Sequence, residues 1–136
     1  MRRARLFAAV GAAMILWSGS GCMRRDATPP QPPRPRSTAS VAIRDPVPGA
    51  VITGRKVRLQ VELTGGRIVL QTSANLAPDE GHLHLKLDGT LVSMTPGLVE
   101  ILEVTPGSHV VEVEFVANDH LAFDPRVLAA VPFTVK

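Results

Sequence analysis

The 136-residue chain predicts an antiparallel β-sandwich, and three observations carry that prediction. From residue 40 onward, short runs alternate apolar and polar residues with a period of two, which is typical of half-buried strands. Gly, Pro, Asn and Asp interrupt these runs at short intervals, as in all-β sandwiches. No run has the length and the 3.6-residue period of a helix. Residues 40–136 suffice for one modest core.

The first half of this region predicts two strands. Residues 56–63 alternate without interruption, with Val57 and Leu59 on one face and Lys56 and Arg58 on the other. Gly65-Gly66 then predicts a turn before a strand at residues 67–71. Residues 73–80, which contain a proline and two acidic residues, are expected to form a loop.

The second half predicts five more strands, at residues 82–87, 91–94, 98–104, 109–116 and 127–135. Asp88-Gly89 between the first two is a strong hairpin signal. Asn118-Asp119 ends the fourth strand, and Pro132 indicates that the last strand lies at a sheet edge. About seven strands in this order favour an immunoglobulin-like architecture. The cysteine pair of antibody domains is missing, because Cys22 is the only cysteine.

The N-terminus predicts export. Three arginines within the first five residues precede an apolar run at residues 6–17, and Ser20 and Gly21 lead into Cys22. This order is typical of a signal peptide, here residues 1–21, that ends at a lipidated Cys22. The segment resembles the bacterial lipobox, with Gly19 where that motif usually has Leu. Cleavage by an ordinary signal peptidase before Gly21 is the alternative. A run of twelve is too short for a membrane helix, which needs about 20 residues.

Residues 22–39 are expected to be the lipidated cysteine and a tether, because residues 29–36 are proline-rich and favour extended polyproline II. The alternative is a proline-rich ligand for a partner domain. The sandwich is assigned to residues 40–136. The prediction therefore places the protein outside the cytoplasm, anchored to a membrane and facing the periplasm or the cell surface.

Charge and composition exclude some partners. Residues 1–39 hold seven Arg and one acid, a net +6, whereas residues 40–136 hold eight Lys or Arg and eleven acids, a net −3. The basic character therefore belongs to the signal and the tether. The domain has neither the basic face nor the stacking aromatics of a nucleic-acid binder.

Histidines supply the one candidate site. His82 and His84 lie two apart on a strand and so share a face, opposite to the leucines at 83, 85 and 87, and are expected to point to solvent. If strands 82–87 and 109–116 are antiparallel neighbours, as strands C and F are in such sandwiches, His120 should join the pair. The acidic residues expected nearby are Asp79, Glu80, Asp119 and Glu114.

This cluster has two interpretations. The imidazoles of His82, His84 and His120 suit Cu or Zn, which makes them candidate metal ligands. Alternatively they are polar residues on an outer sheet face, with Glu114 and Lys86 balancing charge. In either case His82 and His84 are expected to lie across from Glu112 and Glu114. His109 is expected to face inward at the far end of its strand, hydrogen-bonded to backbone, and is left out of the site.

The sequence resembles small exported bacterial immunoglobulin-like domains. The resemblance lies in Gly-His-x-His at residues 81–84 with Asp-Gly at 88–89, in Pro-Gly-x-His at 106–109 and in Asn-Asp-His at 118–120. It covers about residues 42–135. It implies an immunoglobulin-like sandwich in the cell envelope and implies no activity.

Catalytic signatures are missing from the sequence, which has no nucleophile elbow, no His-Glu-x-x-His and no phosphate-binding glycine loop. Ser108 and His109 are adjacent on a strand, so they point to opposite faces. We therefore predict a non-enzymatic envelope lipoprotein whose domain is a binding or structural module with a protein partner in the envelope. The alternative is a protein that binds or handles Cu or Zn through the histidines.

Overall fold

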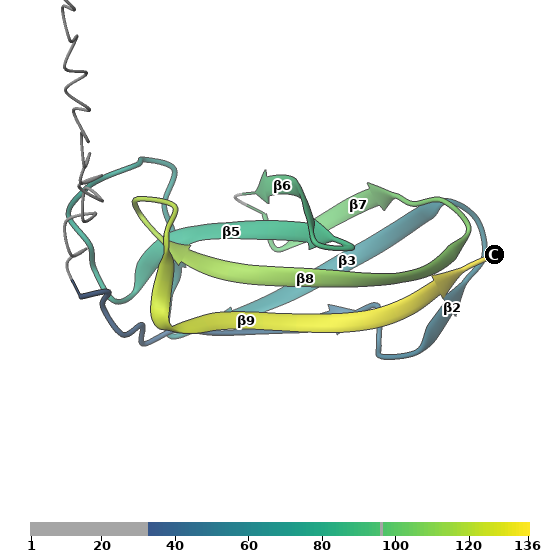
Figure 1. The fold of residues 1–136 in the computed structure, drawn as a ribbon, viewed down its shortest axis with the longest axis horizontal. Coiled ribbons are helices and arrows are strands. Elements are labelled where there is room, and N and C mark those ends of the chain that lie inside the picture. The colour runs from purple at the N-terminus through teal and green to yellow at the C-terminus, as the bar shows by residue number, and fades with distance from the viewer. Residues whose placement is uncertain (1–32, 96) are drawn as a thin grey trace, which may run out of the picture. The chain divides into compact units, whose positions relative to one another are not determined.

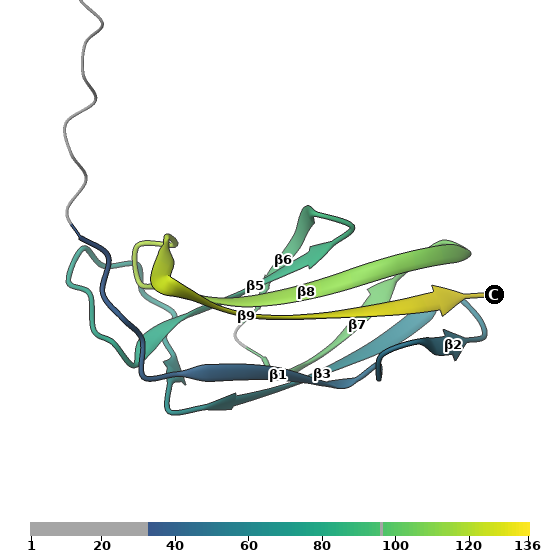
Figure 2. The same cartoon turned by 60° about the horizontal axis from the view of Figure 1, so that its bottom comes forward.

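Nine strands form two facing sheets in the computed structural model, which describes residues 33–95 and 97–136. The compact unit that contains them spans Pro32–Lys136. The smaller sheet has the order β1-β3-β7, and the larger has the order β2-β9-β8-β5-β4, with β6 also paired to β5. Figures 1 and 2 show the two layers, with β1 and β3 in one and β5, β8 and β9 in the other. The predicted immunoglobulin-like β-sandwich is confirmed.

The smaller sheet is antiparallel throughout. β3 (Lys56–Thr64) is its central strand, flanked by β1 (Ser40–Asp45) and β7 (Val99–Glu103). The strand predicted at 56–63 is therefore present. The sequence prediction did not delineate β1, because only Val41 and Ile43 mark its alternation.

The larger sheet is built on β8 (Gly107–Ala117), which lies between β5 (Glu80–Leu87) and β9 (Ala122–Val135). The predicted antiparallel pairing of 82–87 with 109–116 is confirmed. β6 (Thr90–Thr95) forms a hairpin with β5 through Asp88-Gly89, where both φ angles are positive, 51° and 81°. Such angles suit Asp-Gly in a two-residue turn that matches the twist of the strands.

Short strands complete the larger sheet. β2 (Ala50–Ile52) pairs in parallel with the end of β9, and β4 (Arg67–Ile68) pairs in parallel with the start of β5. The strand predicted at 67–71 thus ends at Ile68, and the chain then runs irregularly to β5. β9 begins at Ala122, whereas the prediction began this strand at residue 127. β2 pairs only with the last residues of β9, so most of β9 is an edge strand, as Pro132 indicated.

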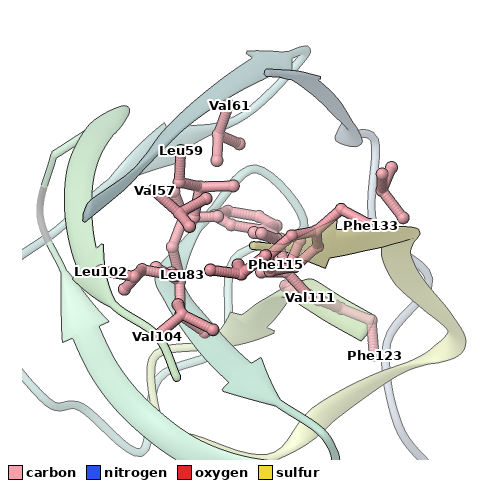
Figure 3. Close-up of a cluster of buried hydrophobic side chains, with 14 of the residues drawn as sticks. Val57, Leu59, Val61, Leu83, Leu102, Val104, Val111, Phe115, Phe123 and Phe133 are labelled. Atoms are coloured by element: carbon pink, nitrogen blue, oxygen red, sulfur yellow. The ribbon is translucent and has the colours of Figure 1, made fainter. Parts of the chain in front are cut away.

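The core fills the space between the sheets. Val57, Leu59 and Val61 of β3 face Leu83 of β5 and Val111 and Phe115 of β8 (Figure 3). Phe115 stacks on Phe123 with ring centroids 5.6 Å apart. Burying these side chains supplies the main driving force for folding, at about 25 cal/mol per Å² of apolar surface. The same packing turns alternate residues of β5 and β8 toward the outside.

The described part of the tether lies on the sandwich. Thr38 N donates to Pro78 O at 3.0 Å, and Asp124 N donates to Pro35 O at 3.0 Å. Residues 34–39 thus contact the sandwich before β1 begins at Ser40. The predicted signal peptide, the lipidated Cys22 and the first part of the tether lie outside the described residues. Within residues 33–95 and 97–136, no helix has the length and apolar character needed to cross a membrane.

Candidate functional site

The alternation of β5 sets the direction of the histidines. Leu83 and Leu85 are fully buried in the core, so His82 and His84 lie on the opposite face of the larger sheet. That part of the prediction is confirmed. The expectation that both point to solvent is wrong for His82, which is only 9% exposed. The β8–β9 turn, residues 118–121, folds over the strand and covers its imidazole.

His120 joins the pair, as the strand pairing predicted. Its ring stacks on that of His82, with centroids 4.2 Å apart and an interplanar angle of 4°. Its Nδ1 lies 3.1 Å from His84 Nε2, and its Nε2 lies 3.1 Å from Thr72 Oγ1. Its φ of 63° places it in the left-handed region, where it turns back over β5. We call His82, His84 and His120 the histidine stack.

Burial favours the neutral form of His82 and His84. Burial lowers the pKa of His82 and of His84, and the nearby His120 lowers both further. A neutral imidazole carries one donor and one acceptor nitrogen. One of the two rings can therefore donate a proton to the other in a hydrogen bond between His84 Nε2 and His120 Nδ1. His82 Nε2 is buried and has no hydrogen-bond partner among the described residues.

Ring geometry decides what the stack can do with a metal. Imidazole lone pairs lie in the plane of the ring, so the lone pairs of the stacked His82 and His120 rings lie in two parallel planes, and one ion cannot lie in both planes at once. In the described part of the chain, no group of three or more His, Cys, Asp or Glu side chains is arranged to hold a metal ion. Three-fold coordination of Cu or Zn would therefore require His120 to rotate away from His82.

Each acidic residue predicted near the histidines has a cationic partner. Arg67 pairs with both Asp79 and Glu80, the former at 3.8 Å. Glu114, whose side chain is 6% exposed, receives two hydrogen bonds of 2.7 Å from Arg126 and lies 3.3 Å from Lys86. The hydrogen bonds from Arg126 lower the pKa of Glu114. These carboxylates are thus engaged in structural ion pairs.

The register between β5 and β8 is shifted by two residues from the expected one. His84 lies opposite Glu114, but His82 lies opposite Val116, and Glu112 lies opposite Lys86. Only one of the two glutamates therefore flanks the stack. Turn lengths decide such a register, and the alternating pattern alone does not reveal it.

Arg34 makes a contact with the β8–β9 turn that the sequence prediction missed. From the tether, its Nη1 and Nη2 donate to Asp119 at 2.6 and 2.9 Å. Its Nε and Nη2 also donate to the carbonyls of Ala122 and Leu121 at 2.9 and 3.1 Å. Asp119, expected beside the histidines, is thereby tied to the tether. A proline-rich segment with scattered arginines gives no sequence signal for such a contact.

His109 lies near the start of β8, at the end of the strand away from the histidine stack. Its Nδ1 lies 2.7 Å from Asp88 Oδ2, and its Nε2 lies 2.8 Å from the carbonyl of Thr105. The hydrogen bond to Asp88 raises the pKa of His109, and the same bond lowers the pKa of Asp88. With both ring nitrogens engaged, His109 has no free position from which to act as a base toward Ser108.

An apolar edge was also missed. Large apolar side chains are exposed on β6, on β7 and on the connection between them, and we call these residues together the β6–β7 edge: Leu91, Val92, Met94, Leu98, Val99 and Ile101. Residues 98–104 read as LVEILEV, in which both alternating sets are mostly apolar. The sequence therefore could not show which set faces outward.

Comparison with known proteins identifies the fold. No family model matches the chain, and no curated protein matches it. The fibronectin(III)-like modules of Clostridium thermocellum CbhA superpose with a TM-score of 0.50 at 16% identity, over 71% of this chain and 94% of that chain. An engineered protein superposes with a TM-score of 0.47 at 12% identity, over 72% of this chain and 20% of that chain. The sandwich described here thus has a fibronectin type III-like, immunoglobulin-like fold.

Proposed function

We propose that this chain is a non-catalytic lipoprotein of the cell envelope whose domain binds a protein partner. One observation carries the binding role. The polar clusters of the domain are used in internal pairs, while the β6–β7 edge presents six large apolar side chains to solvent. An exposed apolar patch of this kind is typical of an interaction site. Fibronectin type III-like folds serve as binding or structural modules, which agrees with this role.

The histidine next to a serine supports the non-catalytic part of the proposal. A nucleophile needs a base within hydrogen-bond reach. His109 instead binds Asp88 and the Thr105 carbonyl. The acidic residues expected around the histidine stack are likewise held in ion pairs with Arg67, Arg126 and Arg34.

The anchor is tested at Cys22. Cys22→Ser should move the protein from the membrane fraction to the soluble fraction and abolish labelling by a radioactive fatty acid, because no thiol remains for lipidation. Ser20→Ala, which keeps a small residue before the cysteine, is the control and should leave both unchanged. Unaltered fractionation of Cys22→Ser would refute the lipid anchor.

Binding is tested by photo-crosslinking in the native cells. A photoreactive amino acid is introduced at one exposed position on each face of the domain, one position per strain. We expect discrete adducts from one face and none from the others. Adducts from no face at all would contradict a protein-binding role.

Metal binding is the second candidate function, and the histidine stack is the observation that favours it. His84 Nε2 and His120 Nδ1 lie 3.1 Å apart, a separation that two ligands of one Zn or Cu ion can have, and His82 becomes a third ligand once His120 rotates away from it. Titration of the full-length chain with Cu²⁺ and Zn²⁺ tests it. Binding tighter than about 1 μM that is lost in His82→Ala/His84→Ala, but kept in the His109→Gln control, supports this function. An absence of saturable binding refutes it.

A further inference from the structure

The edge of β7 is open for hydrogen bonding. β7 pairs with β3 on one side, and no described strand pairs with its other side. An edge strand presents a row of N–H and C=O groups that can pair with another chain. The three-stranded sheet therefore ends at a strand that can accept a fourth.

The two lateral sides of the sandwich are protected differently. On the far side, β1 carries Arg44 and Asp45, both ion-paired, and β9 carries two prolines and is partly covered by β2. Charges and prolines of this kind keep edges from pairing. β6 (Thr90–Thr95) has neither a charged residue nor a proline, and β7 has no proline. Figure 2 shows the β5–β6 hairpin turning away from the layer of β8 and β9.

Apolar side chains flank the open strand. On β7 itself, Val99 is 51% exposed and Ile101 is 55% exposed, on the face that points away from the core. Bringing these side chains out of water would stabilise a bound segment by about 25 cal/mol per Å² of buried apolar surface. Neither residue has a role in the core.

Glu100 gives this edge its chemical preference. It lies opposite Leu59, which is buried, so its side chain points to the inner side of the sheet. One of its carboxylate oxygens, Oε2, is buried and has no hydrogen-bond partner in the described part of the chain. Leaving such a group without a donor is costly, and a charged donor restores the most free energy.

We propose that β7 accepts an extended segment of a partner polypeptide as an added strand, and that a Lys or Arg of this segment pairs with Glu100. The inference rests on the proposed binding function and specifies its partner. Main-chain hydrogen bonds supply affinity in this mode of binding, and side chains that alternate along the strand supply specificity. An inward-facing carboxylate rejects strands that leave it unpaired, so Glu100 selects for a basic segment.

The same charge argues against a second copy as the occupant. In an antiparallel pairing of two β7 strands centred on Glu100, the Glu100 carboxylates of the two copies would face each other, and β7 offers no Lys or Arg to pair with either. Like charges that face each other across paired strands are destabilising. A partner with a basic strand avoids this repulsion.

Labelled seven-residue peptides test the proposal. Each peptide alternates Thr and Val and carries Lys, Ala or Glu at its centre. The full-length chain, kept in detergent, is titrated into the labelled peptide, and binding is followed by fluorescence anisotropy. We expect saturable binding of the Lys peptide, with at least tenfold weaker binding of the Ala peptide and weaker binding still of the Glu peptide. N-methylation of alternate amides in the Lys peptide should abolish binding, because it removes the main-chain donors.

Variants assign the binding to β7. Glu100→Gln should remove the preference for Lys over Ala, and Ile101→Lys should weaken the Lys peptide at least tenfold. Val51→Lys on β2, where the side chain is 59% exposed, is the matched control and should bind as the wild type does. Equal binding of all three peptides, an unchanged preference in Glu100→Gln, or no saturable binding up to about 1 mM would overturn the proposal.

The outcomes separate this proposal from the broader one. Photo-crosslinks from a different face of the domain would leave the protein-binding function in place and refute the role of β7. Concentration-dependent dimerisation of the full-length chain that Ile101→Lys abolishes would assign the edge to a second copy and refute the basic partner.

Discussion

At the scale of single residues, the Asp88–His109 pair shows how a motif histidine can serve stability. The hydrogen bond from His109 lowers the pKa of Asp88 and raises that of His109. A raised His pKa gives stability that is complete below the unfolded value near 6.5 and is lost as pH rises through the folded value. A lowered Asp pKa gives stability that is complete above about 3.9 and is lost as pH falls through the folded value. The pair therefore stabilises most between about pH 4 and 6.5.

Replacing His109 should remove this pH dependence. His109→Gln should lower the free energy of unfolding at both pH values, and the loss should be about 0.5 kcal/mol larger at pH 5.5 than at pH 9. A difference of this size is typical of an ion pair that is screened by solvent. Urea denaturation at the two pH values measures the difference. Asp88→Asn, which keeps a residue that tolerates the positive φ of 51°, should abolish it as well. Equal losses for His109→Gln at both pH values would contradict the pairing.

Gly81 of the Gly-His-x-His motif is required by close packing. A Cβ at this position would collide with the carbonyl oxygen of Val116 and come within 3.0 Å of Phe115 Cζ. Gly81→Ala should therefore cost about 1–3 kcal/mol, as overpacking does. Thermal or chemical denaturation measures the loss. Gly89→Asn is the control, because its side chain enters open space and Asn tolerates the φ of 81°. An unchanged stability of Gly81→Ala would be inconsistent with this packing.

At the scale of elements, the β8–β9 turn contacts both the histidines of β5 and the tether. Through His120 it covers the histidines of β5, and through Asp119 it holds Arg34 of the tether. The stack and the docked tether are therefore structurally connected. The sequence could place Asn118-Asp119 in a turn, but no pattern could show that the tether returns to it.

Removing the guanidinium of Arg34 should loosen this end of the domain. Arg34 makes a two-pronged ion pair and two hydrogen bonds to carbonyls in a partly buried setting, so Arg34→Ala should lower the unfolding free energy by about 1–2 kcal/mol. Limited proteolysis should also cut within residues 33–39 more rapidly. Arg36→Ala is the control, since Arg36 forms no ion pair within the described residues, and it should stay within about 0.5 kcal/mol of the wild type. Equal behaviour of the two variants would refute the docking of the tether.

At the scale of the whole molecule, the sequence predicted the sandwich because the core strands alternate cleanly. The alternation in 56–63 and 82–87 gave the correct inner faces, and Asp88-Gly89 gave the hairpin. Residues 98–104, which contain β7, were ambiguous, since their leucines, valines and isoleucine fill both alternating sets. Only pairing with β3 puts Glu100 inside and Ile101 outside. The histidine cluster followed from strand pairing, whereas its stacked rings depend on the turn at His120.

The distribution of surface chemistry gives the molecule two dissimilar sides. The outer face of the larger sheet carries the network of Lys86, Glu112, Glu114 and Arg126, in which each group has an opposite charge within 3.5 Å. The β6–β7 edge carries exposed apolar residues and the unpaired carboxylate oxygen of Glu100. Because an apolar edge with one unsatisfied acid is costly in water, we expect it to be covered in the working assembly.

Site-specific photo-crosslinking in native cells tests this expectation most directly. The photoreactive residue replaces Ile101 on β7 in one strain and Val51 on β2 in another, two side chains of similar exposure on opposite sides of the sandwich. The account predicts a discrete protein adduct from position 101 and none from position 51. An adduct from position 51 alone, or from neither position, would contradict it.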